Sequence, residues 1–258
     1  MSRLQGKVCV ITGATGMAAA AARRFTEEEA EVFVISQHEA ECRSLRLPFA
    51  LADLRDEAST EAAFAAATAH CGRIDALFAV AGASGRGLGD GPVHELTLTG
   101  WTGTFALNAV PAFLAAREAV RAMHSQEPNE VGARGAIVLM SSVLAEHPEP
   151  TLFATHAYAA SKAAIIGMAR SMAAYYAPQC IRVNVLAPAL VATPMSARAA
   201  ADPASVAFAE RAQPLSGGFL DPVEVVEAAV YLCADESRGV TGQVLAIDGG
   251  WGVRGGRG

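Results

Sequence analysis

The chain has 258 residues, of which 52% are hydrophobic and 18% charged, and its formal net charge is −6. This composition excludes an intrinsically disordered protein, because such chains contain too few apolar residues to form a core. The acidic balance also argues against a nucleic-acid-binding protein, since phosphate contacts require a basic surface.

The amino-terminal residues predict neither a signal peptide nor a membrane span. Residues 1–7 are mostly polar, and the apolar run that follows, Val8–Ile11, is far shorter than either segment requires. The five cysteines lie far apart without a CxxC pair, and the six histidines are scattered without an HExxH motif. We therefore expect a cytoplasmic protein with reduced thiols and no dedicated metal site.

Short apolar runs alternate with alanine-rich helical patterns along the whole chain. The runs expected to form strands are 7–12, 31–36, 48–52, 74–81, 136–141, 181–187 and 243–247. The expected helices are 16–29, 56–70, 100–124, 157–176 and 221–234. This alternation predicts an α/β fold: a single domain over residues 1–258, with a doubly wound (Rossmann) parallel sheet of about seven strands flanked by helices.

Two long connections follow predicted strands, at 143–157 and 189–220. Because open parallel sheets bind ligands at the carboxyl ends of their strands, we expect both connections to border the site. We expect residues 189–220 to be a substrate loop. The apolar residues expected to line the pocket are Met195, Val206, Phe208, Leu215 and Phe219. The glycine-rich end, residues 254–258, is expected to fray.

A glycine-containing turn joins the first predicted strand to the first helix. Gly13 permits a tight turn, Gly16 lets the backbone approach a pyrophosphate, and Ala18 lets the helix pack closely on the sheet. Thr15 and Met17 complete this turn. Its position at a helix N-terminus predicts a dinucleotide site.

The second predicted strand ends in Ile35-Ser36-Gln37-His38. An acid at this end would hold the ribose 2′-hydroxyl of NAD, and a basic residue would hold the 2′-phosphate of NADP. Neither is present, although Ser36 and Gln37 offer hydrogen-bond donors. The cofactor choice therefore stays open between NAD and NADP, with a slight lean to NADP.

Tyr158 and Lys162 open a predicted helix with i,i+4 spacing, which places them on one face. A unit charge about 4 Å from the phenol, at an effective dielectric constant near 20, is worth roughly 4 kcal/mol. That would lower the pKa of a tyrosine from near 10 towards neutral. We therefore expect Tyr158 to act as an acid/base. The alternative is that the two side chains are merely neighbours.

The chain resembles the short-chain dehydrogenase/reductase family over nearly its whole length. The matching segments are Thr12-Gly13, Asp53-Leu54, Ala81-Gly82, Leu107-Asn108-Ala109, Ser141-Ser142-Val143, Tyr158 with Lys162, Pro188–Thr193 and Asp248-Gly249-Gly250. The resemblance implies an NAD(P)-dependent oxidoreductase that acts on a carbonyl or alcohol carbon of a small molecule. It also implies a homotetramer that uses helices 100–124 and 157–176.

Four catalytic roles follow from the resemblance. Tyr158 is the expected general acid/base, and Lys162 is expected to lower its pKa and hold the nicotinamide ribose. Ser142, rather than its neighbour Ser141, is expected to bind the substrate oxygen. Asn108 is expected to anchor a proton-relay water.

The resemblance also implies the residues that bind the cofactor. Asp53 would face the adenine amino group, although it could instead cap the helix that begins near Asp56. Leu54 would supply backbone contacts, and Val191 and Thr193 would fix the carboxamide. The full expected set is Gly13, Thr15, Gly16, Met17, Ser36, Gln37, Asp53, Leu54, Ala81, Gly82, Tyr158, Lys162, Pro188, Val191 and Thr193.

The chain departs from the family pattern in two places near the cofactor. The glycine turn is one residue shorter and ends in Ala18, and the usual Asn-Asn-Ala-Gly is Ala79-Val80-Ala81-Gly82. These departures support an alternative, a non-catalytic dinucleotide-binding or regulatory protein on the same fold. A third hypothesis is a related fold that performs lyase or dehalogenase chemistry.

Overall fold

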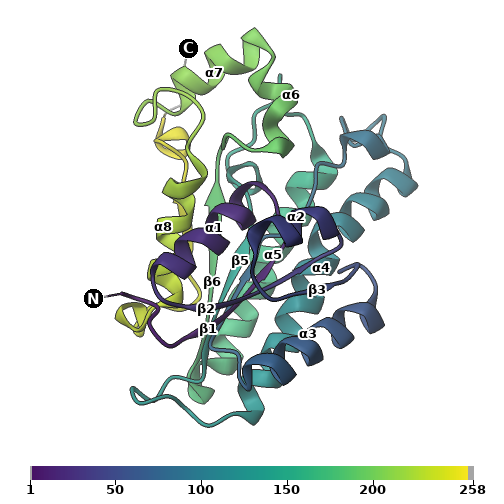
Figure 1. Ribbon diagram of the computed structural model, residues 1–258. Helices are drawn as coiled ribbons and strands as arrows, with labels where there is room; N and C mark the ends of the chain where they lie inside the picture. Colours follow the sequence, from purple (N-terminus) through teal and green to yellow (C-terminus); the bar gives the residue numbers. More distant parts are fainter. Residues whose placement is uncertain (1, 255–258) are drawn as a thin grey trace.

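The computed structural model describes residues 2–254 as one parallel sheet with helices on both faces (Figure 1). The strands are β1 (Val8–Thr12), β2 (Glu31–Ser36), β3 (Phe49–Leu51), β4 (Ala76–Ala79), β5 (Gly135–Met140), β6 (Ile181–Pro188) and β7 (Val244–Ile247). Their order in the sheet is β3-β2-β1-β4-β5-β6-β7. The predicted fold class is confirmed, because each expected strand is present and all pairs are parallel.

The helices are α1 (Gly16–Glu27), α2 (Glu39–Leu45), α3 (Glu57–Cys71), α4 (Leu98–Ser125), α5 (His156–Tyr176), α6 (Ala197–Ala200), α7 (Pro203–Ala212) and α8 (Pro222–Cys233). The expected helices are all present, but α2, α6 and α7 were not predicted. The connection 189–220 is therefore partly helical. Asp202 starts α7, because its side chain accepts a hydrogen bond from the Ser205 N–H and Pro203 occupies the first turn.

Each face of the sheet has its own apolar core. On one face, strand residues such as Val10 and Ile137 pack against α3, α4 and α5. On the other, residues such as Ile11 and Phe78 pack against α1 and α8. The strands are apolar on both sides because both faces are covered, as expected for a doubly wound sheet.

The strand order changes direction between β1 and β4, which are neighbours in the sheet. The Thr12 hydroxyl oxygen, at the end of β1, accepts hydrogen bonds from the Val80 and Ala81 N–H groups at 3.0 and 3.1 Å. This contact joins the two strand ends where the Asn-Asn side chains of the family pattern are missing. The crevice at such a switch point is the usual ligand site of the fold.

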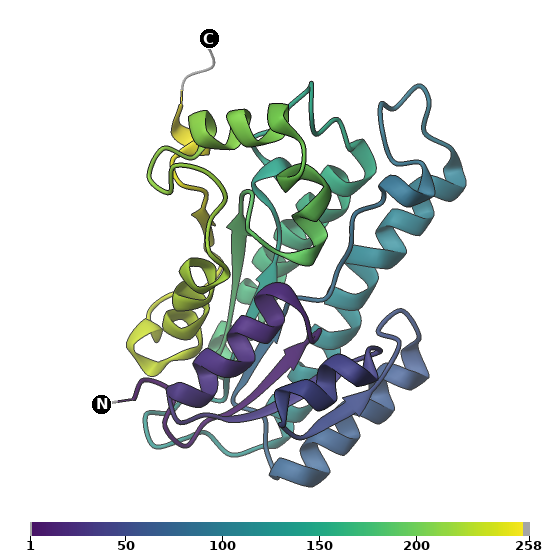
Figure 2. The ribbon, with the colours of Figure 1, turned by 45° about the horizontal axis from the view of Figure 1, so that its top comes forward.

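The segment that contains α6 and α7 lies beyond the carboxyl end of β6, at the top of Figures 1 and 2. Gln213, which is fully buried, closes this segment. Its side chain accepts from the Leu190 N–H at 2.8 Å and donates to the carbonyl oxygens of Leu190 and Gly218 at 3.0 and 2.8 Å. Both ends of the segment are therefore fixed to one buried amide.

Within residues 2–254, no helix is both long enough and apolar enough to cross a membrane. Of the tail expected to fray, only Arg254 lies within the described residues.

Candidate active site

Two connected cavities lie at the carboxyl ends of the strands. The first, here called the cofactor groove, is bounded by the β1–α1 turn and by the residues after β2, β3 and β4. The second, the substrate pocket, lies between the ends of β5 and β6 and the segment that contains α6. Met17, Gly82 and Thr193 line both, so the two spaces are continuous. An extended dinucleotide fits this arrangement, with one end reaching the pocket.

The predicted cofactor residues divide between the two cavities. Those in the groove are Gly13, Thr15, Gly16, Met17, Ser36, Gln37, Asp53, Leu54, Ala81, Gly82 and Thr193. Tyr158, Lys162, Pro188 and Val191 line the substrate pocket. Their placement is that of a dinucleotide site, and their individual contacts with a cofactor stay predictions.

The glycine turn has the backbone that its sequence suggests. Gly13 and Gly16 have φ angles of 96° and 52°, a region that favours glycine. A methyl group at Gly13 would lie 3.2 Å from the Ala18 side chain, so the turn and α1 pack closely. The Thr15 side chain makes no cap hydrogen bond to α1. The first N–H groups of this helix therefore face the groove, where a phosphate can bind.

At the far end of the groove, Ser36 is buried and its hydroxyl accepts from the His38 N–H at 3.2 Å, whereas Gln37 is exposed. Asp53 does not cap α3, because that position is filled by Asp56. Asp53 instead pairs with Arg55 at 2.6 Å. Arg55 also lines the groove. Sequence reasoning missed it because it follows β3 and not β2.

Ser142, Tyr158 and Lys162 come together on one wall of the substrate pocket. The neighbouring Ser141 is buried, and its hydroxyl donates a hydrogen bond to the Lys162 carbonyl oxygen at 2.9 Å. This hydroxyl therefore joins the end of β5 to α5. Ser142 is therefore the serine whose hydroxyl is available to a ligand beside Tyr158, and its role in binding the substrate oxygen stays a prediction.

Burial is the largest influence on the pKa values of Tyr158 and Lys162. The Lys162 Nζ donates to the Met140 carbonyl oxygen at 3.0 Å and lies 5.6 Å from the centroid of the Tyr158 ring. Burial raises the pKa of Tyr158, although hydrogen bonding with Ser142 acts in the opposite direction. Burial also lowers the pKa of Lys162 to about 8. Lys162 contributes no lowering of the Tyr158 pKa in this arrangement, because its ammonium is directed at a backbone carbonyl. Its expected role in catalysis stays a prediction.

Asn108 is buried in α4 and its side chain is occupied by the protein. Its Oδ1 accepts from the Ala83 N–H at 3.2 Å, and its Nδ2 donates to the carbonyl oxygens of Ala83 and Thr104 at 2.9 and 3.0 Å. The side chain thus joins α4 to the chain after β4, and only its Oδ1 keeps capacity for a further hydrogen bond. Its role in holding a relay water stays a prediction.

A buried acid, Asp90, positions the helix that contains Tyr158. Its two carboxylate oxygens accept from the N–H groups of Ala157 and Tyr158, both at 2.9 Å. A negative charge at a helix N-terminus satisfies otherwise unpaired donors. Sequence analysis missed Asp90 because it lies far from α5 in the chain. The nearby His156 accepts from the Val93 N–H and lines neither cavity, so it serves the loop.

The substrate pocket differs from the predicted lining. Met195 lines it, but Leu215 is 88% exposed and therefore cannot. Phe208 contributes indirectly, because it packs against Phe153 and Trp251 with ring centroids 6.0 and 4.8 Å apart. The lining residues that sequence analysis did not single out include Arg86, Leu144, Phe153, Leu190, Arg198 and Trp251. The expected residues Val206 and Phe219 are not among the lining.

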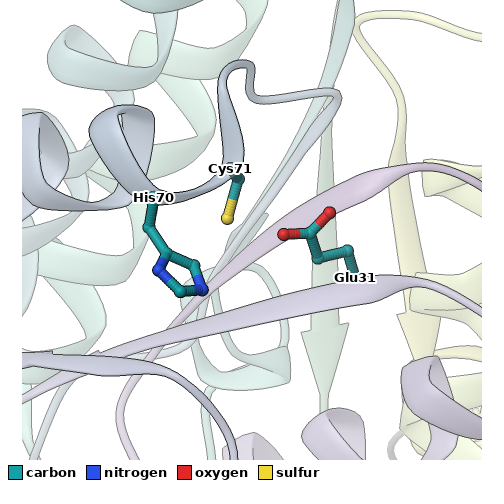
Figure 3. A group of neighbouring side chains, drawn as sticks. All are labelled: Glu31, His70 and Cys71. Atoms are coloured by element: carbon teal, nitrogen blue, oxygen red, sulfur yellow. The ribbon is translucent and has the colours of Figure 1, made fainter.

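Another cluster of polar side chains lies at the opposite, amino-terminal edge of the sheet (Figure 3). Glu31 begins β2, His70 and Cys71 end α3, and their potential ligand atoms lie within 4.8 Å of one another. Burial and the Glu31 carboxylate raise the pKa of the Cys71 thiol to about 12. At neutral pH this thiol keeps its proton, which a metal ion would have to displace. We assign no metal to the cluster.

The chain matches the family model described as enoyl-(acyl carrier protein) reductase over residues 12–252. It is 34% identical over 263 residues to short-chain dehydrogenase reductase 3a of Arabidopsis thaliana, with 97% of each chain covered. It is 33% identical over 254 residues to cis-4-hydroxycyclohexanecarboxylate dehydrogenase of Sinomonas cyclohexanicum, covering 95% of this chain and 96% of the relative. The ligand-free structure of aldohexose dehydrogenase from Thermoplasma acidophilum matches with a TM-score of 0.86 at 26% identity, covering 100% of this chain and 98% of that chain.

Proposed function

Because the chain belongs to the short-chain dehydrogenase/reductase family and is an oxidoreductase of that type, we propose that it interconverts a ketone and a secondary alcohol. The family implies a nicotinamide cofactor, NAD or NADP. The observation that most supports the proposal is the grouping of Ser142, Tyr158 and Lys162 in a pocket that opens into the cofactor groove.

The protein's own part of the reaction is to orient the substrate and move one proton. When bound, the nicotinamide supplies or accepts the hydride. In reduction, the Tyr158 hydroxyl donates its proton to the carbonyl oxygen; in oxidation, it accepts the alcohol proton. A proton donor or acceptor works best with a pKa near the working pH, so the raised pKa of Tyr158 would have to fall when the substrate and cofactor bind. The Ser142 hydroxyl donates a hydrogen bond to the same substrate oxygen.

For the cofactor we favour NADP. No carboxylate ends β2, so the group that usually selects NAD is missing there. Arg55 lines this end of the groove in a surface ion pair with Asp53. Such exposed pairs contribute about 0–1 kcal/mol, so Arg55 can exchange its partner for a 2′-phosphate at small cost.

The substrate we favour is a cyclic, largely apolar alcohol or ketone. Phe153, Leu190 and Trp251 give the pocket a broad apolar wall. The Sinomonas relative is named for cis-4-hydroxycyclohexanecarboxylate, whose ring such a wall would accommodate.

Substitution of Tyr158 by Phe tests the catalytic role. We expect turnover of cyclic ketones to fall by about 10²–10⁴-fold, because the proton donor is lost, while cofactor affinity stays within about twofold. Tyr175→Phe is the matched control, since Tyr175 lies on the same helix and is 70% exposed. Wild-type turnover by Tyr158→Phe would refute the role.

Titration with NADPH and NADH, followed by nicotinamide fluorescence, tests the cofactor. We expect NADPH to bind more tightly and Arg55→Ala to weaken NADPH alone. Failure of both nucleotides to bind a folded sample would exclude the oxidoreductase proposal. Binding without turnover of any ketone or alcohol would support the non-catalytic alternative. The predicted homotetramer and cytoplasmic location stay predictions, and the mass in solution tests the first.

A further inference from the structure

The substrate pocket is positively charged although the protein is acidic. The chain has 20 basic residues (Lys and Arg) against 26 acidic ones. Nevertheless the charged side chains that line the pocket are Arg86, Lys162 and Arg198, and none of the described residues that line it is Asp or Glu. Lys162 belongs to the proposed catalytic group, which leaves two arginines without a role.

The two arginines approach each other from distant parts of the chain. Arg86 follows β4, and Arg198 lies in α6. The Arg86 Nη2 donates to the Leu152 carbonyl oxygen at 2.7 Å, which holds the guanidinium in place. The other N–H groups of the guanidinium remain available to a ligand. Burial, together with repulsion from Arg198, lowers the pKa of Arg86. Both side chains line the same pocket.

No acid within residues 2–254 forms an ion pair with either arginine. The nearby carboxylates are already engaged. Asp90 accepts from two N–H groups of α5, and Asp202 accepts from the Ser205 N–H and hydroxyl at the start of α7. Asp90 and Asp202 offset part of the charge on Arg86 and Arg198 from a distance. Neither carboxylate forms an ion pair with an arginine, so both exposed guanidinium groups can still bind an anion at the mouth of the pocket.

We propose that the substrate is a cyclic hydroxy or oxo acid, whose carboxylate binds Arg86 and Arg198 while its alcohol or ketone carbon lies beside Tyr158. This inference rests on the proposed function and specifies its substrate class. Guanidinium groups hold a carboxylate through paired N–H bonds. Phe153, Leu190 and Trp251 line the same pocket and offer an apolar surface for the ring.

Matched substrates test the inference directly. The probes are 4-oxocyclohexanecarboxylate and 4-oxocyclohexanecarboxamide, which differ in charge and not in shape. We expect kcat/KM to favour the carboxylate by roughly tenfold to a hundredfold, the usual effect of hydrogen bonds to a charged group. Arg86→Gln and Arg198→Gln should each reduce this ratio. Arg23→Gln, an exposed arginine of α1, is the control and should keep the wild-type ratio.

A binding measurement separates this inference from the proposed function. Cyclohexanecarboxylate has no reducible group, and its binding can be measured by calorimetry beside cyclohexanecarboxamide. We expect the acid to bind wild type and to bind either arginine variant at least about tenfold more weakly. If cyclohexanecarboxylate binds in this way but neither ketone is turned over, the proposed function is wrong and the anion site at the two arginines is still supported.

Three results would overturn the inference. They are equal turnover of the two ketones, equal binding of the acid and the amide, and a carboxylate preference that survives both substitutions. A tenfold rise in the cofactor KM with an unchanged preference would assign the arginines to the cofactor instead. If Arg86→Gln loses activity on both ketones, the loss of the Leu152 contact explains it, and Arg198→Gln decides the test.

Discussion

Lys162 is expected to lower the stability of the protein while it serves catalysis. It is 3% exposed, and burial lowers its pKa from the ordinary 10.5 to about 8. Each unit of difference between the pKa values of the folded and unfolded states corresponds to about 1.4 kcal/mol. At pH 7 the buried ammonium therefore destabilises the fold by roughly 3 kcal/mol.

Lys162→Met removes this charge and keeps most of the side-chain volume. The variant loses the hydrogen bond to the Met140 carbonyl oxygen, which costs about 1 kcal/mol. We therefore expect the free energy of unfolding to rise by about 2 kcal/mol at pH 7, with Tm about 4–8 °C higher. Turnover should be lost, so stability and activity change in opposite directions.

The pH dependence gives the sign of the effect. Because the folded pKa lies below the unfolded one, the unfolded chain binds more protons between pH 8 and 10.5. The stability of the wild type relative to the variant should be constant below pH 8. It should then rise by about 2 kcal/mol between pH 8 and 9.5.

Urea denaturation of both proteins at four values from pH 6.5 to 9.5, followed by circular dichroism, measures the difference. Lys7→Met is the control, because Lys7 is the other lysine of the chain and pairs with Asp235 at 2.7 Å. That substitution should give no gain in stability. A Lys162→Met variant less stable than the wild type at pH 7, or a difference independent of pH, would refute the reasoning.

Three further predictions concern the surroundings of the site. Asp90→Asn should lower the free energy of unfolding by about 1–3 kcal/mol and reduce kcat, because one charge-assisted hydrogen bond to α5 is lost. Urea denaturation measures the first effect and steady-state kinetics the second. Gly85→Ala should cost about 1–3 kcal/mol, since a methyl group there overlaps a side chain of α4, whereas Gly87→Ala, in open space, should change stability by less than about 0.5 kcal/mol. Cys71 should resist iodoacetamide at pH 8 while the exposed Cys180 reacts, as peptide mass spectrometry can show; equal labelling would contradict this.

The fold could be predicted because its signals are local. Continuous apolar runs such as Val8–Thr12 identify buried strands, and their alternation with helices specifies a parallel sheet. The helix α7 was missed although Asp202 and Pro203 provide a start signal, because the alanine-rich stretch 189–220 resembles a loop in composition. The helix α2 has seven residues, too few for a periodic pattern to emerge.

The site could be predicted only in part. The proposed catalytic side chains could be named because Tyr158 and Lys162 share one helix face and match the pattern of the family that the chain resembles. Arg86 and Arg198 lie far apart in the sequence, and nothing near either one indicates that they share a pocket. The direction of the pKa change in Tyr158 was also not predictable, because it depends on how far tertiary packing removes water from the phenol.

The buried amide of Gln213 has a consequence for how this protein can diverge. Its side chain joins Leu190 to Gly218, the two ends of the segment that contains α6 and α7. Loop closure entropy grows slowly with length, so insertions or replacements inside the segment would cost little and leave the sheet intact. The sequence of this segment can therefore change independently of the sheet. Replacement of Met195 and Arg198 would suit a new substrate, while Ser142 and Tyr158, which lie outside the segment, stay in place.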